Sequence, residues 1–387
     1  MSAKNSRMIC RFAWRRYWSL PFVLTIWPLM GLAAQEGASG ITQPVVLPSF
    51  NPKAPPCSRP PGLSRSLAYV QENERDFLEG VNHGLSMAAK DRDVEYQRIV
   101  VTNDVGKAVE QIQKFKQKKI GALIATSSDP VAVSTSLQQV IWTGAYVGTI
   151  VPPPATLLLN APQYATGKAL TDAAIAHIQS KLHGKANVVL LTQDTMQFLA
   201  PRFEAMRDGL SALPEVTIIA DIAPNPVSKE GGKATMNTIL LANPDVDVVL
   251  GSDAVVLGAL EALRAAGKVR PDQFLGGIDG EPDAVAEIRK PDSPFKVSIA
   301  LSSPIFGYAM GQYGADWMDG KSVPQAMDIM PSALTQANID QYETDWENPA
   351  AVFADPVRRK NYLKMYGNIC YDSRDNYLNF PWSSETR

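Results

Sequence analysis

Short apolar runs, each followed by a longer amphipathic stretch, recur along this chain. The run Phe274–Ile278 stops at Asp279-Gly280, and a helical pattern then begins at Pro282 with Val285 and Ile288 on one face. An apolar run of this length predicts a buried strand, and proline is favourable in the first turn of a helix. The stretch therefore predicts a strand, a tight glycine turn and a helix, which together make one β-α unit.

The same unit repeats through most of the sequence. Strands are predicted at 66–70, 96–101, 120–124, 145–151, 186–191, 216–220, 246–251, 274–278 and 295–300. Helices are predicted at 77–89, 105–118, 131–140, 167–182, 201–213, 232–243, 255–266 and 305–318. Strands that alternate with helices predict parallel, doubly wound α/β sheets, and two consecutive sets predict two lobes. Because ligands bind beyond the carboxyl ends of such strands, Asp279 is a candidate ligand-binding residue, although it could merely cap the turn.

The N-terminal residues are predicted to lie outside the fold. Basic residues up to Arg16 precede an apolar run, 18–33, that ends in small residues before Ala34, which is typical of a secretory signal peptide over 1–33. This predicts a location in a bacterial periplasm. Arg15-Arg16 leaves both the general secretory and the twin-arginine export routes open. Residues 34–63 are rich in Pro, Ser and Gly and predict an irregular lead-in.

Composition narrows the classes of function. The chain has 387 residues, 45% hydrophobic and 20% charged, which is typical of a soluble globular protein. A net charge of −2 gives no electrostatic footprint for nucleic acid. The sequence lacks a G-x-S-x-G elbow, a phosphate-binding P-loop and an H-E-x-x-H zinc motif, and its histidines, His83, His177 and His183, fall on predicted helices or their ends. Neither an enzyme nor a cofactor is predicted.

Two cysteines, Cys57 and Cys370, remain after removal of the signal peptide. In an oxidising compartment they predict one disulfide between the lead-in and the C-terminal tail, and two unpaired thiols are the alternative. Neither cysteine has metal-ligand spacing with a histidine, so no metal site is predicted.

Four short segments carry a family resemblance. Ala242-Asn-Pro-Asp-Val246, Ser252-Asp253, Leu257-Gly-Ala-Leu-Glu-Ala-Leu263 and Gly277-Ile-Asp-Gly-Glu-Pro282 resemble the ribose/galactose-type periplasmic binding proteins of ABC transporters. The resemblance extends over about 64–330. It implies a type I fold of two lobes, each a doubly wound parallel sheet flanked by helices, with the ligand cleft between the lobes.

The resemblance also implies how the chain is divided and what it does. The N-terminal lobe is expected at 64–160 plus 302–329, the C-terminal lobe at 161–301 plus 330–345, and an extension at 346–387 with a short helix at about 356–366. The implied function is capture of a small molecule and its delivery to an ABC permease by a monomer. The alternative is a periplasmic sensing subunit that presents its ligand to a membrane sensor kinase.

Individual site residues follow from the matched positions. Asp279, Arg202 and Phe77 fall on ligand-binding positions of the family, although Arg202 could form a surface salt bridge and Phe77 could be ordinary core. Val151 replaces an Asp-Arg pair, Ser252 replaces an Asn, and Leu301 replaces a Gln. An Asn is also replaced by Ala125, and two aromatic positions by Val227 and Ile278. These departures predict a ligand less polar than a common pyranose, because buried hydroxyls without partners are costly. The full expected set is Arg75, Phe77, Ser127, Val151, Arg202, Ser252, Asp279 and Leu301.

Overall fold

The computed structural model describes residues 45–127, 129–150 and 154–385. The predicted signal peptide, the start of the lead-in and Val151 lie outside these residues. Within the described ranges, no helix is both long and apolar enough to span a membrane.

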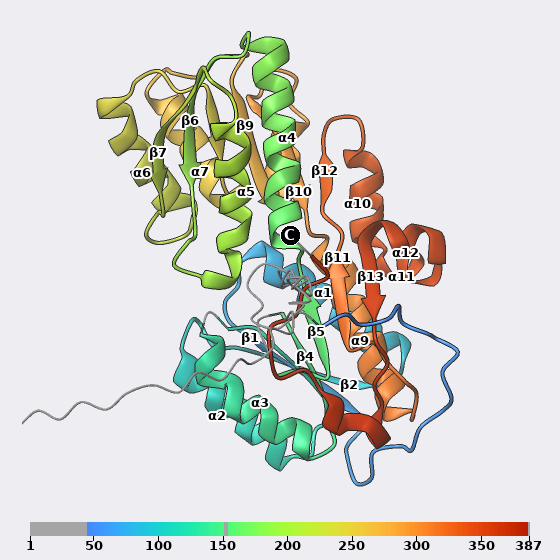
Figure 1. The fold of residues 1–387 in the computed structure, drawn as a ribbon. Coiled ribbons are helices and arrows are strands. Elements are labelled where there is room, and N and C mark those ends of the chain that lie inside the picture. Colours follow the sequence, from blue (N-terminus) through green and yellow to red (C-terminus); the bar gives the residue numbers. More distant parts are fainter. Residues whose placement is uncertain (1–44, 128, 151–153, 386–387) are drawn as a thin grey trace, which may run out of the picture. The chain divides into compact units, whose positions relative to one another are not determined.

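The first lobe is built on a mainly parallel sheet (Figure 1). Within the described residues its seven strands lie in the order β13-β11-β5-β4-β3-β1-β2, and only β13 runs antiparallel to its neighbour. The strands are β1 (Ser66–Gln71), β2 (Glu95–Val100), β3 (Ala122–Ala125), β4 (Tyr146–Thr149), β5 (Leu157–Asn160), β11 (Ala326–Ile329) and β13 (Leu363–Tyr366). Its helices are α1 (Asp76–Asp91), α2 (Val105–Gln117), α3 (Pro130–Trp142) and α9 (Ser303–Met318).

The second lobe has its own sheet, of six strands in the described part of the chain, in the order β12-β10-β9-β8-β6-β7. All neighbours are parallel except β12 and β10. The strands are β6 (Ala186–Leu191), β7 (Val216–Ile222), β8 (Val248–Leu250), β9 (Phe274–Asp279), β10 (Phe295–Ala300) and β12 (Ser332–Leu334). The helices are α4 (Gln163–Lys181), α5 (Ala200–Ser211), α6 (Lys229–Ala242), α7 (Asp253–Ala265) and α8 (Pro282–Ile288), with a short 3-10 turn, η1 (Gln197–Leu199).

The central strands of each sheet are buried on both faces, which explains why strands such as β3 and β6 are almost continuous apolar runs. In β6, Val188 and Leu190 pack toward α4 and α5, whereas the alternate residues Val189 and Leu191 pack toward α6 and α7. The first lobe repeats the arrangement, with α1 and α9 on one face of its sheet and α2 and α3 on the other. The predicted fold, two doubly wound α/β lobes, is confirmed.

The chain passes between the two sheets several times. It leaves the first sheet between β5 and α4, returns between β10 and α9, and leaves again between β11 and β12. The tail then returns once more to add β13 to the first sheet. Strands β5, β11, β12 and β13 are absent from the sequence-based prediction, and the strand predicted at 145–151 ends at Thr149.

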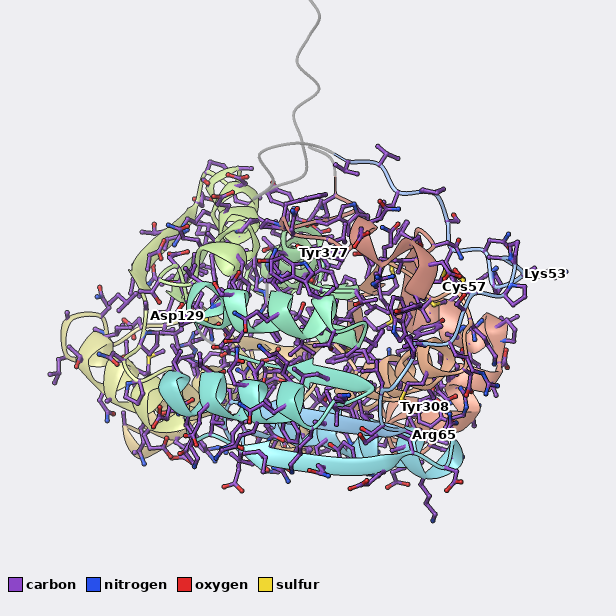
Figure 2. The ribbon with its side chains drawn as sticks, turned by 90° about the horizontal axis from the view of Figure 1, so that it is seen from below. Lys53, Cys57, Arg65, Asp129, Tyr308 and Tyr377 are labelled. Atoms are coloured by element: carbon purple, nitrogen blue, oxygen red, sulfur yellow. A yellow bond between two sulfur atoms is a disulfide. The ribbon has the colours of Figure 1, made fainter. Side chains whose placement is uncertain are left out.

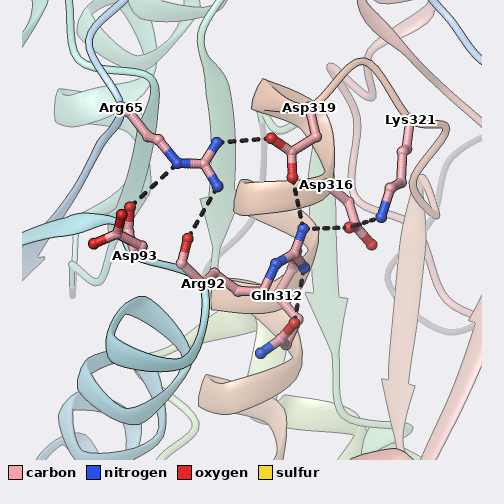
Figure 3. Close-up of polar contacts among 7 residues, drawn as sticks. All are labelled: Arg65, Arg92, Asp93, Gln312, Asp316, Asp319 and Lys321. Carbon is pink, nitrogen blue, oxygen red and sulfur yellow. Dashed lines mark hydrogen bonds and ion pairs between the residues drawn. The ribbon is translucent and has the colours of Figure 1, made fainter.

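A polar network fixes one end of the first lobe (Figure 3). Arg65, just before β1, forms an ion pair with Asp319 at 2.7 Å. Arg92, just after α1, contacts both Asp316 and Asp319 at 2.8 Å and donates to Gln312 Oε1 at 2.8 Å. Burial lowers the pKa of Arg92, but the combined effect of the Asp316 and Asp319 carboxylates is larger, so the pKa is raised above its ordinary value. The network therefore ties α1 to α9, the helix that carries the chain back from the second lobe.

The described part of the C-terminal extension contains regular secondary structure. Helices α10 (Ile339–Glu347), α11 (Pro349–Ala354) and α12 (Pro356–Tyr362) precede β13, and a 3-10 segment, η2 (Tyr371–Asn376), follows it. The predicted helix begins at Pro356 but ends at Tyr362, because the chain then becomes extended to pair with β11.

The predicted disulfide between Cys57 and Cys370 is present, with the two Cα atoms 6.2 Å apart. Figure 2 shows Cys57 on the segment that precedes β1 and Tyr377 beside α3. Gln138 of α3 donates to the Tyr377 hydroxyl, so the tail lies against the body after the disulfide as well as before it.

Candidate ligand-binding site

A cavity of about 390 Å³ is lined by residues of both lobes. It opens where strand ends of the two sheets face each other, which is the usual position of ligands in doubly wound folds. The lining residues are Glu72, Asn73, Arg75, Phe77, Leu78, Asn103, Thr126, Ser127, Ile150, Leu158, Leu159, Asn160, Ala161, Gln163, Gln193, Met196, Phe198, Leu199, Arg202, Val227, Asp279, Leu301, Ile329, Pro381, Trp382, Ser383 and Glu385.

Asp279 ends β9 at the cavity wall. Its φ is 123° and that of Gly280 is 74°, so both residues have backbone conformations that L-amino acids rarely adopt. The turn is held from two sides: the Gly280 N–H donates to Ser298 Oγ at 3.0 Å, and the Tyr342 hydroxyl donates to the Gly280 carbonyl at 3.0 Å. A strained backbone that its surroundings enforce is frequent at ligand-binding sites. No hydrogen bond from a described residue reaches the Asp279 carboxylate, so its oxygens are available to a ligand.

Arg202 lies in the first turn of α5 and is only 4% exposed. Its Nε donates to Gln163 Oε1 at 2.9 Å, while its two Nη atoms have no hydrogen-bond partner within the described chain. Burial lowers the pKa of Arg202, and the nearby charge of Asp279 opposes this. A Cβ on Gly167 would lie 1.9 Å from the Arg202 carbonyl, so glycine is what lets α4 approach α5 and place this guanidinium.

Two further carboxyl groups lie behind Asp279. Asp253 is fully buried; it accepts from Ser298 Oγ at 2.8 Å and from the Glu281 N–H at 2.8 Å. Burial, and then the charge of Asp279, raise the pKa of Asp253 to about 7. Burial, and then the charges of Asp279 and Asp253, raise the pKa of Glu281 to about 9. Glu281 therefore carries a proton near neutral pH, and Asp253 carries one below about pH 7.

We predict that Asp253 makes the protein less stable as the pH rises from about 4 to about 7. In this range the folded protein keeps a proton on Asp253 that the unfolded chain, with a carboxyl pKa of 3.8, releases, so the free energy of unfolding falls with pH. Asp253→Asn should flatten this slope, by up to about 4 kcal/mol across the range. Urea unfolding at pH 4.5, 6 and 7.5 measures it, with exposed Asp245→Asn as the control. Equal slopes in Asp253→Asn and the wild type would refute the prediction.

The first lobe contributes an aromatic ring and amides. Phe77, 7% exposed, packs its ring 5.7 Å from that of Phe306, and the Arg75 guanidinium lies 5.4 Å from the Phe77 ring. Phe77 is thus a core residue and a lining residue at once. Asn73 Nδ2 donates to Asn103 Oδ1 at 2.8 Å, which holds the loops after β1 and β2 together.

The structure brings most of the expected residues to one cavity. Arg75, Phe77, Ser127, Arg202, Asp279 and Leu301 all line it, together with Val227. Ser252 is buried outside the lining, where its Oγ accepts from Gln193 Nε2 at 3.1 Å, so the side chain that reaches the cavity is Gln193. Ile278 and Ala125 are buried strand residues outside the lining, and Val151 lies outside the described residues.

Sequence reasoning missed several polar lining residues. Asn73 and Asn103 follow β1 and β2, Asn160 ends β5, and Gln193 follows β6. For Asn73, Asn103 and Gln193, an amide within three residues of the end of a predicted parallel strand was the available signal, since strand ends of one sheet converge. Asn160 ends a strand that was not predicted. Nothing in the local sequence pointed to the tail residues Pro381, Trp382, Ser383 and Glu385.

Comparison with known proteins agrees with this architecture. A family described as a periplasmic binding protein domain matches residues 68–322. The ribose import binding protein of Bacillus subtilis is 26% identical over 278 residues, which cover 67% of this chain and 83% of that protein.

Solved structures show the same fold. A 5-methylthioribose transporter solute-binding protein from Thermotoga lettingae, in complex with 5-methylthioribose, has a TM-score of 0.65 at 19% identity and covers 76% of this chain and 94% of its own. A Mycobacterium smegmatis protein in complex with β-D-fucofuranose has a TM-score of 0.67 at 20% identity, covering 79% of this chain and 100% of its own. The match over 68–322 and the two doubly wound lobes lead to one conclusion: the chain belongs to the periplasmic binding protein domain family.

Proposed function

We propose that this protein is the solute-binding component of an ABC importer and captures a small sugar or sugar-like molecule in the cavity described above. The observation that carries the proposal is that a buried Arg202, whose Nη atoms have no hydrogen-bond partner among the described residues, and an Asp279 carboxylate that accepts no hydrogen bond from those residues line the same cavity. Charged groups without protein partners are costly to bury, so a ligand that hydrogen-bonds to them would restore the lost interactions.

The lining favours a ligand with one polar and one apolar side. Asp279 offers hydrogen-bond acceptors and Arg202 offers donors. The side-chain amides of Asn73, Asn103 and Gln193 can both donate and accept hydrogen bonds. Phe77, Met196, Phe198, Val227 and Leu301 supply apolar contacts. We propose a single-ring sugar less polar than a common pyranose, such as a furanose with a methyl or methylthio substituent. The ligands named for the Thermotoga and Mycobacterium structures, 5-methylthioribose and β-D-fucofuranose, are of this kind.

The remaining parts of the proposal follow from the family. Export by the N-terminal segment would place the protein in the periplasm, where a monomer would pass its ligand to a membrane permease without catalysis. The ribose import binding protein supports this more than it supports a sensing subunit for a kinase, because its name describes import.

A thermal-shift screen tests the proposal. Single-ring sugars, deoxy and methylthio furanoses, polyols and aromatic acids are added at millimolar concentration, and at least one sugar should raise Tm by several degrees. A ligand present at a hundredfold excess over Kd stabilises the folded state by about 2.7 kcal/mol. Shifts produced only by aromatic acids would overturn the sugar proposal, and a strong preference for common pyranoses would overturn the claim of a less polar ligand.

A further inference from the structure

The last part of the tail is firmly attached to the first lobe. Ala155 and Leu378 exchange two backbone hydrogen bonds, at 2.9 and 3.0 Å. The Trp382 ring lies 5.0 Å from that of Tyr366, and Trp382 Nε1 donates to the Val45 carbonyl at 2.9 Å. Trp382 is 4% exposed. The tail therefore reaches the cavity as a packed segment with a defined path.

Beyond Trp382 the tail contacts the second lobe. The Glu385 carboxylate accepts from the backbone N–H of Ala165 at 2.7 Å and from that of Tyr164 at 3.3 Å, in the first turn of α4. The N-cap of this helix is Pro162, which makes no side-chain capping bond. Because the first N–H groups of a helix lack partners within it and its N-terminus favours negative charge, Glu385 performs the capping that Pro162 cannot. The Glu385 N–H donates to Ser383 Oγ at 3.1 Å, which stiffens the end of the segment.

The same segment forms one side of the cavity. Pro381, Trp382, Ser383 and Glu385 all line it, next to the β5–α4 connection, where Asn160 Nδ2 donates to Ser383 Oγ at 3.4 Å. The cavity volume of about 390 Å³ lies near the lower end of the range of about 300–1,000 Å³ for small-molecule sites. Without these side chains, the cavity would extend along the start of α4.

We propose that residues 381–385 form a specificity-determining wall of the ligand site, held against α4 by Glu385, which limits the ligand to one sugar ring. The inference rests on the proposed function, since it concerns the ligand of the same cavity. It gives the extension a role in selection: a second ring would need the space that the Glu385 side chain occupies beside the start of α4. The tail is thus part of the binding site although it lies far beyond the two lobes in sequence.

Two variants test the wall. Glu385→Ala removes the contact with α4 and leaves the packing of Trp382 in place, whereas a stop codon at position 381 removes the whole wall. Asp375→Asn, an exposed carboxylate on the same tail, is the matched control. Two measurements are made on the mature full-length protein: amide hydrogen exchange at Tyr164 and Ala165 without ligand, and calorimetric binding of D-ribose, 5-methylthioribose and sucrose.

In the wild type and Asp375→Asn we expect protected amides, binding of a single-ring probe and exclusion of sucrose. In Glu385→Ala, exchange at Ala165 should rise about tenfold or more, as expected for loss of a hydrogen bond to a charged group, and single-ring affinity should fall several-fold. Sucrose should become a ligand of Glu385→Ala and of the truncated protein.

The outcomes separate this proposal from the proposed function. Suppose that the wild type binds a single-ring probe, and that both variants bind it with the same affinity and still exclude sucrose. The proposal that residues 381–385 select the ligand would then be wrong, and the sugar-binding function would stand. If none of the three sugars and no other sugar of the thermal-shift screen binds to any form of the protein, the sugar-binding function is wrong, and the proposed wall is wrong with it even if exchange at Ala165 accelerates. If the truncated protein does not fold, binding of sucrose and amide exchange in Glu385→Ala alone test the proposal.

Discussion

Asp279→Asn is expected to weaken binding of the best single-ring sugar from the thermal-shift screen by about 10–150-fold, as expected for loss of a hydrogen bond to a charged group worth about 1.5–3 kcal/mol. The substitution keeps the shape of the side chain and one acceptor oxygen but removes the negative charge. No described residue donates a hydrogen bond to this carboxylate, so its oxygens can accept from ligand hydroxyls. Isothermal titration calorimetry of the two proteins at the same pH measures the change in Kd.

The protein fold should survive this substitution. Asparagine tolerates positive φ better than most residues, which matters at a position with a φ of 123°. A modest decrease in Tm is expected, because the negative charge of Asp279 stabilises the charged form of Arg202, which burial disfavours. Asp283→Asn, an exposed carboxylate four residues later, serves as the control. Normal sugar affinity in Asp279→Asn, or loss of its native circular dichroism, would return Asp279 to a purely structural role in the turn.

Removing the Cys57–Cys370 disulfide should produce the largest loss of stability. The two cysteines are 313 residues apart, and in the chain-entropy model cross-linking a loop of this length stabilises the folded state by about 6 kcal/mol. For a protein of this size the corresponding decrease in Tm is on the order of 10 °C. The double variant Cys57→Ala, Cys370→Ala, compared with the wild type by differential scanning calorimetry, measures it.

Reductant provides the control for this prediction. Wild-type Tm should fall in dithiothreitol to near the value of the double variant, whereas the double variant should show no response. The segments that the bond joins keep other contacts, such as the Ser58 N–H donating to Asp372 Oδ2 at 2.7 Å, so the native fold should persist at room temperature. Equal melting temperatures for the wild type and the double variant would show that the disulfide adds no stability beyond these other contacts.

Local patterns were most informative in the second lobe. Strands β6 and β10 have the bounds that the sequence predicted, Ala186–Leu191 and Phe295–Ala300. Both are buried on two faces and are bounded by turn residues, so the apolar run and the strand coincide. Most helices also fall within a few residues of prediction, because a stripe of apolar residues at helical spacing records which face is buried.

Strands stabilised by distant partners were not predictable in this way. Strand β11 contains Asp328, and β13 follows directly on a helix, so neither shows a clean strand pattern. Their extended conformation comes from the pairing of β13 with β11 and of β11 with β5, and strand formation depends on such context more than helix formation does. The predicted helix at 356–366 failed in its second half for this reason.

The residues of the candidate site also differ in how far the sequence could predict them. Asp279, Arg202 and Phe77 could be found because they sit at strand ends or helix starts of a fold that the sequence reveals. Gln193 reaches the cavity in place of Ser252 because of a side-chain contact that no sequence pattern records. Trp382 and Glu385 reach it because of the path of the tail, which only the three-dimensional structure shows.

The return of the tail to the first sheet also limits the order in which the two lobes can be completed when the chain becomes available from its N-terminus. In the described chain, five of the six strands of the second sheet lie between Ala186 and Ala300, so this lobe becomes available almost as one continuous stretch. The first sheet starts earlier, at Ser66, but needs β11 and then β13, which ends at Tyr366. Pairings between residues so far apart form slowly, because the long loop must close before the contacts can stabilise it. The lobe that begins first in the sequence is therefore the last to be completed.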